Sequence, residues 1–311
     1  MKAYVALTSF AGNKKAMELL NSVSDEIVVR TEAERPNKKE LLALVTQYEI
    51  LIIGVKEKMD FDVYKASTKL KYLCTLSIGT DHIDKAFFDS EIIEVVKCSD
   101  ANVHTVAEFV FAYILSHMKS FSECNEAFIS RTGREGIKNM PSEISSKTVG
   151  VIGAGRIAKK FFEISNTFSF NRLCWTFQPE QHHDFISNYG VEFADLESLC
   201  KSSDYIIVLI PYSDKTEKLL SASLLAQAKP TAKIINVSRM NIMDVPCFLE
   251  QVKMGKFEGS LIDCFPDEIA EEQIESIAGK ISFSPHVAGI SVESRKRMSG
   301  EIAEKIVEVV R

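Results

Sequence analysis

Short apolar runs alternate with helix-forming patterns along most of the chain, and this alternation constrains the fold more than any other feature. In the N-terminal third, the predicted strands are Tyr4–Leu7, Glu26–Val29, Ile50–Ile53, Tyr72–Leu76 and Ile93–Val96. Helical patterns lie between them, around residues 13–22, 38–47 and 59–67. Strands that are separated by helices favour a parallel sheet, because a parallel connection needs a crossover that is usually helical. This part of the chain is therefore predicted to form a doubly wound α/β unit.

A second alternating series follows a long helix, which is predicted to start near residue 102 with Asn102 as its cap. A polar stretch over residues 131–146 leads into the series. Its predicted strands are Thr148–Ile152, Arg172–Thr176, Tyr205–Leu209, Ala232–Val237, Gly259–Ile262 and Ile281–Ser284. The last segment, Val292–Val310, has the pattern of an amphipathic helix. The predicted fold class is thus α/β, with two doubly wound parallel-sheet domains.

The composition agrees with two globular domains and excludes several classes of function. Hydrophobic residues make up 46% of the 311 residues and charged residues 26%, which is ordinary for globular proteins and argues against disorder. A net charge of −6 without a block of Lys or Arg argues against nucleic-acid binding. No apolar run is long enough to span a membrane or to serve as a signal peptide. The seven cysteines are scattered singly, so we expect no disulfide framework, no metal site and a cytoplasmic location.

The run Thr148–Ala158 combines a predicted strand, a glycine-rich turn and the start of a helix. Gly153 permits the tight turn, Gly155 lets the backbone approach a pyrophosphate, and Ala158 is small enough for close packing of helix on strand. The N–H groups at the helix start, at Arg156 and Ile157, would bind the anion. A chance turn also matches so short a motif, but its place at the head of an α/β series favours dinucleotide binding.

The residue that selects between NAD and NADP is expected at the end of the next strand. That position is Gln178, which is neutral, while Glu180 lies slightly late in the sequence. Lys159 and Lys160 are near in sequence to the phosphate turn, although they also suit a solvated helix face. The choice of cofactor therefore stays open, with NAD slightly favoured because no Arg ends the strand.

Three charged residues follow later predicted strands. They are Arg239, Glu268 and His286. Because the carboxyl ends of parallel strands meet at one edge, these side chains are expected to converge there. Arg can bind a carboxylate through two hydrogen bonds, and His can exchange a proton near neutral pH. The plainer alternatives are a surface ion pair, a solvated acidic loop in which Asp267 could replace Glu268, and a capping histidine.

Seven motifs, in their order and spacing, resemble the D-isomer-specific 2-hydroxyacid dehydrogenase family over essentially the whole chain. They are SIGTDHID (77–84), NVHTVAEFVFAYIL (102–115), KTVGVIGAGRIA (147–158), LIPYSDKTEKLL (209–220), INVSRMNIMD (235–244), GSLIDCFPDE (259–268) and SPHVAGISVES (284–294). The resemblance implies a flavodoxin-like substrate domain, residues 1–100 plus 290–311, and a Rossmann NAD(P)-binding domain, residues 101–289. It also implies a homodimer formed through the region 102–130.

The same resemblance implies a role for each matching residue. Arg239 would bind the substrate carboxylate, His286 would act as acid and base, and Glu268 would support His286. The loop Ser77, Ile78 and Gly79 would bind substrate through its backbone N–H groups. The residues expected at the cofactor are Gly153, Gly155, Arg156, Ile157, Gln178, Pro211, Thr216, Val237, Ser238, Asp263, Gly289 and Thr105.

The implied reaction is hydride transfer between a nicotinamide cofactor, NAD or else NADP, and a small 2-oxo acid or D-2-hydroxy acid. Two departures from the family pattern bear on it: Met240 follows Arg239 where Gly is usual, and Ile269 follows Glu268 where Pro is common. Met240 is expected to narrow the site or to reshape its loop. The alternatives are a dinucleotide-sensing binding protein of the same fold and a formate dehydrogenase.

Overall fold

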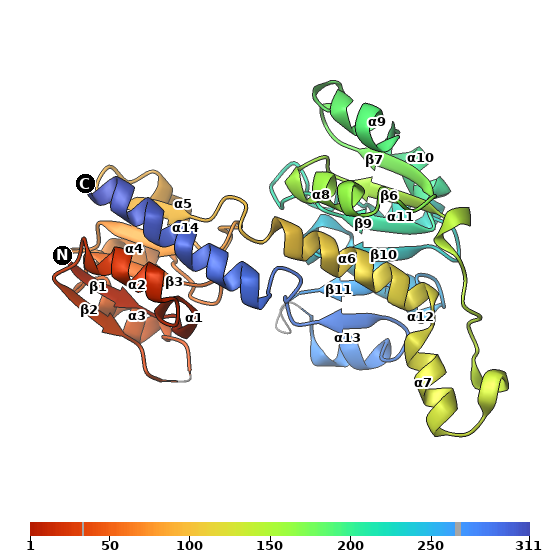
Figure 1. Cartoon of the computed structure of the whole chain (residues 1–311), viewed down its shortest axis with the longest axis horizontal. Helices are drawn as coiled ribbons and strands as arrows, with labels where there is room; N and C mark the ends of the chain where they lie inside the picture. Colours follow the sequence, from red (N-terminus) through yellow and green to blue (C-terminus); the bar gives the residue numbers. More distant parts are fainter. Residues whose placement is uncertain (33, 265–268) are drawn as a thin grey trace. The chain divides into compact units, whose positions relative to one another are not determined.

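The computed structural model describes residues 1–32, 34–264 and 269–311, which form two compact units (Figure 1). Unit 1 consists of Met1–Asn102 with Ile290–Arg311, and unit 2 consists of Val103–Gly289. Each unit has a parallel sheet with helices on both faces, which confirms the predicted α/β class. Within the described ranges, no helix is both long enough and apolar enough to cross a membrane.

The sheet of unit 1 contains all of the strands predicted for this part of the chain. They are β1 (Lys2–Val5), β2 (Glu26–Val29), β3 (Ile50–Ile53), β4 (Tyr72–Thr75) and β5 (Glu94–Lys97). Their order is β2-β1-β3-β4-β5, and all neighbouring strands run parallel. This order is the flavodoxin-like one, in which ligands bind outside the carboxyl ends of the strands.

Two hydrophobic cores cover the two faces of this sheet. The helices are α1 (Thr8–Ala11), α2 (Lys14–Asn21), α3 (Lys38–Leu44), α4 (Phe61–Ala66), α5 (Lys85–Phe88) and α14 (Val292–Val310). Helices α1, α2 and α14 pack on the face that includes Ala3 and Val5, while α3, α4 and α5 pack on the face that includes Tyr4. Since side chains alternate along a strand, β1 supplies both cores. The C-terminal helix α14 thus belongs to the same unit as the N-terminus.

Unit 2 has a larger sheet, and its strand order locates its ligand edge. The strands are β6 (Thr148–Ile152), β7 (Asn171–Trp175), β8 (Glu192–Phe193), β9 (Tyr205–Val208), β10 (Lys233–Asn236), β11 (Leu261–Asp263) and β12 (Ser282–Ser284). Their order is β12-β11-β10-β9-β6-β7-β8, so the direction of winding reverses between β6 and β9. This is the Rossmann arrangement, and the reversal marks the place where dinucleotides bind. The sequence analysis did not predict the short edge strand β8.

The helices of unit 2 also cover both faces of its sheet. They are α6 (Val103–Met118), α7 (Phe121–Ile129), α8 (Arg156–Ile164), α9 (His183–Tyr189), α10 (Leu196–Ser202), α11 (Ala222–Gln227), α12 (Val245–Lys253) and α13 (Glu271–Ser276), with short 3₁₀ turns η1 (Gly133–Gly136), η2 (Ile144–Ser146), η3 (Pro179–Gln181) and η4 (Met240–Ile242). Helices α6 and α8 lie side by side on one face, and α10, α11 and α12 share the core of the other. Helix α7 and the segment after it extend away from the sheet (Figure 1).

One predicted helix cap is wrong. Asn102 directly precedes α6, but its buried side-chain oxygen accepts no hydrogen bond from the described residues. The predicted position of the helix itself is correct, because its apolar residues Val106, Val110 and Ile114 are buried at helical spacing.

Candidate active site

Most of the predicted site residues of unit 2 lie at the carboxyl edge of its sheet. Gly153 follows β6, Gln178 follows β7, Arg239 follows β10, and His286 follows β12. Because these strands are parallel neighbours, the loops after them belong to one edge of the sheet. This is the edge at which an open α/β sheet binds its ligands.

The glycine-rich turn after β6 needs glycine at its first position. Gly153 has φ +108°, and a Cβ there would lie 3.0 Å from the carbonyl oxygen of Leu209 on the loop after β9. Gly155 differs, since a Cβ there would meet no protein atom within 4 Å. No side chain caps α8 at Gly155, and a helix start of this kind offers backbone N–H groups to an anion. The turn therefore fits a pyrophosphate, with open space beside Gly155.

The end of β7 carries no acidic side chain. Gln178 is exposed, and the neighbouring Phe177 packs edge-on against Trp175 with ring centroids 4.8 Å apart. Lys159 pairs with Asp184 at 2.6 Å and Lys160 with Glu163 at 2.7 Å. Both lysines therefore have carboxylate partners on the protein surface.

Two side-chain hydroxyls organise the loops after β9 and β10. Thr216 is 2% exposed; its hydroxyl accepts from the N–H of Ser213 at 2.8 Å and donates to the carbonyl of Pro211 at 2.9 Å. Ser238 donates to the carbonyl of Ile210 at 2.5 Å and so links the two loops. The Thr216 hydroxyl therefore closes its own loop, and a contact of this residue with the cofactor stays a prediction.

Asn236 shapes the backbone at Arg239, and the sequence analysis missed this residue. Its buried side chain donates to the carbonyl of Arg239 and accepts from the N–H of Ser238, each at 3.0 Å. Arg239 is half-buried, and its guanidinium donates to the carbonyl of Ser238 at 3.0 Å. An Asn at the end of a strand that bonds two residues ahead is a known turn signal, so the residue could have been found.

Met240 is buried in the protein core, at 3% exposure, together with Ile242 and Ile269. Its backbone does not adopt a positive φ. Glycine is therefore not required after Arg239 in this chain, because Met240 has an ordinary backbone conformation. Its thioether side chain fills core volume, whereas the sequence analysis expected it to narrow the site or to reshape its loop.

A buried carboxylate fixes the loop that carries His286. Asp263, at 3% exposure, accepts from the Ser284 hydroxyl at 2.6 Å and from the N–H groups of Val287 at 2.8 Å and Ala288 at 2.9 Å. His286 lies between these donors and has φ +54°, which side chains other than glycine adopt infrequently. Backbone strain of this kind persists only where the surrounding structure enforces it. Asp263 supplies that constraint.

Glu268, predicted to support His286, lies outside the described residues, as does its alternative Asp267. Thr105 is half-buried in the first turn of α6. Gly289 is the last residue of unit 2, directly after the loop that carries His286. Their predicted contacts with cofactor or with His286 stay predictions.

In unit 1, the loop Ser77–Gly79 follows β4 and is held by a chain of hydrogen bonds. The Ser77 hydroxyl donates to the carbonyl of Gly79 at 2.7 Å. Thr75 Oγ1 lies 2.9 Å from Ser77 Oγ and 3.0 Å from His82 Nε2. Ser77 has only one hydrogen, so Thr75 must donate to it, and His82 Nε2 must then donate to Thr75. The chain therefore runs in one direction from His82 to Gly79 and assigns the hydrogen of His82 to Nε2.

Comparison with known proteins places the chain in a family. The model of the NAD-binding domain of D-isomer specific 2-hydroxyacid dehydrogenases matches residues 111–288. A glyoxylate reductase of Thermofilum pendens is 26% identical over 301 residues, covering 95% of this chain and 88% of the relative. A D-3-phosphoglycerate dehydrogenase of Methanocaldococcus jannaschii is 27% identical over 96% of this chain. This chain spans only 56% of that relative's length.

A solved structure shows the same fold. The D-lactate dehydrogenase from Aquifex aeolicus, complexed with NAD and lactic acid, has a TM-score of 0.83 at 23% identity. The match covers 100% of this chain and 94% of that protein. The matched domain is an NAD-binding one, which establishes a nicotinamide cofactor for this chain. The chain therefore belongs to the D-isomer-specific 2-hydroxyacid dehydrogenase family.

Proposed function

We propose that the protein catalyses the reversible reduction of a small 2-oxo acid to its D-2-hydroxy acid, with Arg239, Glu268 and His286 as its catalytic residues. One observation carries the proposal most: a buried carboxylate, Asp263, holds the strained His286 at the same sheet edge as the phosphate turn and Arg239. A strained backbone held by a dedicated partner is typical of functional sites.

In the reducing direction, Arg239 would bind the substrate carboxylate through its planar guanidinium. The N–H groups of residues 77–79 in unit 1 are proposed as further substrate ligands, with Ser77 fixing the Gly79 carbonyl. When bound, the cofactor supplies the hydride. His286, in its protonated form, would give a proton to the oxygen of the reduced carbon. Glu268 would stabilise the imidazolium because its charge is opposite.

For the cofactor we propose NAD(H), with NADP(H) as a weaker alternative. Gln178 is neutral, so it does not exclude the 2′-phosphate of NADP(H). However, no Arg ends β7 to attract that phosphate, and this favours NAD(H). The nearby Lys159 and Lys160 already pair with carboxylates. The ratio of kcat/KM for NADH to that for NADPH measures this preference, and a ratio below one would contradict it.

The first test is oxidation of NADH and NADPH by the purified protein with a panel of 2-oxo acids. The panel contains glyoxylate, hydroxypyruvate, pyruvate, phenylpyruvate, 2-oxoglutarate and phosphohydroxypyruvate, and formate with NAD is included in the opposite direction. Turnover of one 2-oxo acid that disappears in His286→Ala would support the proposal. Cofactor binding without turnover of any acid would indicate a dinucleotide-sensing protein, and formate-dependent reduction of NAD would indicate a formate dehydrogenase.

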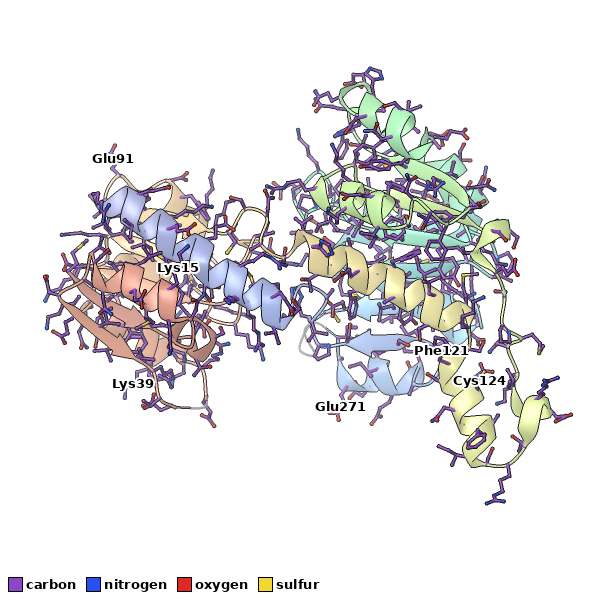
Figure 2. All side chains as sticks on the ribbon, viewed as in Figure 1. Lys15, Lys39, Glu91, Phe121, Cys124 and Glu271 are labelled. Atoms are coloured by element: carbon purple, nitrogen blue, oxygen red, sulfur yellow. The ribbon has the colours of Figure 1, made fainter. Side chains whose placement is uncertain are left out.

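We also propose a homodimer that forms through the region 102–130, which contains α7, and through the segment directly after it. Four large apolar side chains there are exposed: Phe121 at 62%, Phe128 at 84%, Ile129 at 71% and Met140 at 75% (Phe121 is labelled in Figure 2). Exposed apolar side chains gathered on one projecting segment are typical of an interface. Light scattering of the wild type and of Phe128→Ser tests this, and a monomeric wild type would contradict it.

None of the cysteines, all of them in described ranges, forms a disulfide, which supports the proposed cytoplasmic location.

A further inference from the structure

A polar side chain, that of Asn236, is buried in the apolar interior of unit 2. Asn236 is the last residue of β10 and is 1% exposed. It is paired in register with Val208 on β9 and with Ile262 on β11, so its strand is an interior one. Because side chains alternate along a strand, it faces the same side of the sheet as Ile234, which shares a core with Met240. Burial of an amide among apolar groups is unfavourable unless its hydrogen bonds are made.

Both ends of the Asn236 amide are bonded to the same short segment. Its Oδ1 accepts from the N–H of Ser238, and its Nδ2 donates to the carbonyl of Arg239, each at 3.0 Å. The first partner can only donate and the second can only accept, so the partners fix the orientation of the amide. A carboxylate would lack the donor, and an apolar side chain would lack both groups.

These two bonds enclose the peptide group that contacts the guanidinium. The carbonyl of Ser238 lies in the chain between the two groups that Asn236 binds, which are the N–H of Ser238 and the carbonyl of Arg239. Arg239 Nη1 donates to this Ser238 carbonyl at 3.0 Å. The guanidinium is planar and rigid, so one fixed hydrogen bond restricts where its other N–H groups point. Asn236 therefore acts on the direction of the Arg239 head group through the backbone.

Other contacts attach this segment to the protein without replacing the amide. The Ser238 hydroxyl donates to the carbonyl of Ile210, on the loop after β9. The carbonyl of Arg239 also accepts from the N–H of Ile242, at 3.3 Å, as part of the turn η4. The segment thus stays attached at both ends if the amide of Asn236 is lost. We expect such a loss to change the direction of the guanidinium while the loop remains folded.

We propose that Asn236 is a positioning residue for substrate binding: its amide directs the Arg239 guanidinium so that two N–H groups meet the two oxygens of the substrate carboxylate. This inference rests on the proposed function, in which Arg239 binds that carboxylate. Binding through two parallel hydrogen bonds depends on direction, because both bonds must form in one plane. The carboxylate is held in the same way before and during hydride transfer, so the positioning acts on KM more than on kcat.

The first test is steady-state kinetics of Asn236→Leu with NADH and the best 2-oxo acid of the panel. Leu has nearly the shape of Asn but neither of its hydrogen-bonding groups. We expect KM for the acid to rise by about tenfold to thirtyfold, with kcat within about threefold of the wild type and KM for NADH unchanged. The matched control is Ile234→Val, on the same face of β10 and in the same core, which also lowers Tm but should keep the KM of the wild type.

A double-mutant cycle with Arg239→Met separates positioning from a general loss of stability. Met keeps an unbranched side chain but has no guanidinium to direct. Asn236→Leu should lower kcat/KM by about tenfold or more when Arg239 is present, and by less than about twofold in the Arg239→Met background. An equal decrease in both backgrounds, or an unchanged KM in Asn236→Leu, would overturn the proposal. If Asn236→Leu does not fold, Asn236→Asp takes its place in the cycle, since Asp keeps the acceptor for the Ser238 N–H and lacks only the donor.

A failure of the proposed function gives a different result. If Arg239→Met has the KM of the wild type, Arg239 does not bind the carboxylate, whatever the effect of Asn236→Leu. Oxamate, a 2-oxo-acid analogue that has a carboxylate but accepts no hydride, gives the same comparison without turnover, through quenching of NADH fluorescence. A wild type that neither binds oxamate nor reduces any 2-oxo acid would overturn both proposals.

Discussion

Two loops that follow parallel strands, one in each unit, are held by different chemistry. In unit 1, the loop after β4 depends on neutral groups, with His82, Thr75 and Ser77 passing hydrogen bonds in one direction. In unit 2, the loop after β12 depends on the buried carboxylate of Asp263 and its three donors. Hydrogen bonds to a charged group contribute more, and their loss costs more, than bonds between neutral groups. Loss of the Asp263 carboxylate should therefore cost more free energy of unfolding than loss of one neutral hydrogen bond in the loop after β4.

The largest expected effect is on turnover through the loop of unit 2. His286→Ala should lower kcat by about 10²- to 10⁴-fold, because the proton donor is lost. Steady-state kinetics with the best 2-oxo acid measure the change, and fluorescence titration of NADH should give an unchanged Kd. Turnover close to that of the wild type would remove His286 from the acid/base role.

The second effect tests the carboxylate directly. Asp263→Asn should lower the free energy of unfolding by about 2–3 kcal/mol, because the amide N–H₂ would face the N–H of Ala288 or of Val287. Urea unfolding measures this, with Ser284→Ala as the control, since that variant removes one donor and leaves the carboxylate. If Asp263→Asn costs no more than Ser284→Ala, the charge is not what holds the loop.

The third effect is a loss of stability at acid pH that arises in unit 2. His117 of unit 2 is partly buried, and its pKa is lowered to about 4 because of that burial. Below its ordinary pKa the unfolded state binds a proton that the folded state does not, so stability falls between about pH 6.5 and pH 4. His117→Gln should remove on the order of 1–2 kcal/mol of this acid sensitivity, allowing for the solvent-exposed part of the ring. Unfolding curves at pH 7 and pH 5 measure the difference, and an equal loss in the wild type and His117→Gln would contradict it.

The smallest effect concerns the neutral chain of unit 1. Thr75→Val keeps the shape of the side chain but removes the central hydroxyl, which should cost about 1 kcal/mol. If the loop 77–79 binds substrate, KM for the 2-oxo acid should rise by roughly threefold to tenfold, with kcat little changed. His82→Gln, which retains a donor, should stay closer to the wild type than His82→Leu. An unchanged KM in Thr75→Val would show that the chain stabilises the loop without serving substrate binding.

The sequence predicted most of the fold because strands such as Ile50–Ile53 are continuous apolar runs. It missed β8, because a two-residue edge strand has no such run. It wrongly assigned the cap at Asn102, whose buried side-chain oxygen accepts no hydrogen bond from the described residues. Near the site, the glycine turn was visible from spacing, whereas the bonds of Asp263 were not. Its partners lie more than twenty residues further along the chain, so only the folded sheet brings them together.

The place of α14 in unit 1 has a consequence for how the protein is made. Met298, Ile302 and Ile306 of this helix share a core with Phe10 and Leu20, which the ribosome produces more than 250 residues earlier. Unit 2, residues 103–289, is continuous in sequence and can fold while translation proceeds. Until residues 290–311 have left the exit tunnel, the part of this apolar face that α14 covers must stay exposed. Protection of nascent unit 1 by a chaperone is therefore most needed during translation of unit 2.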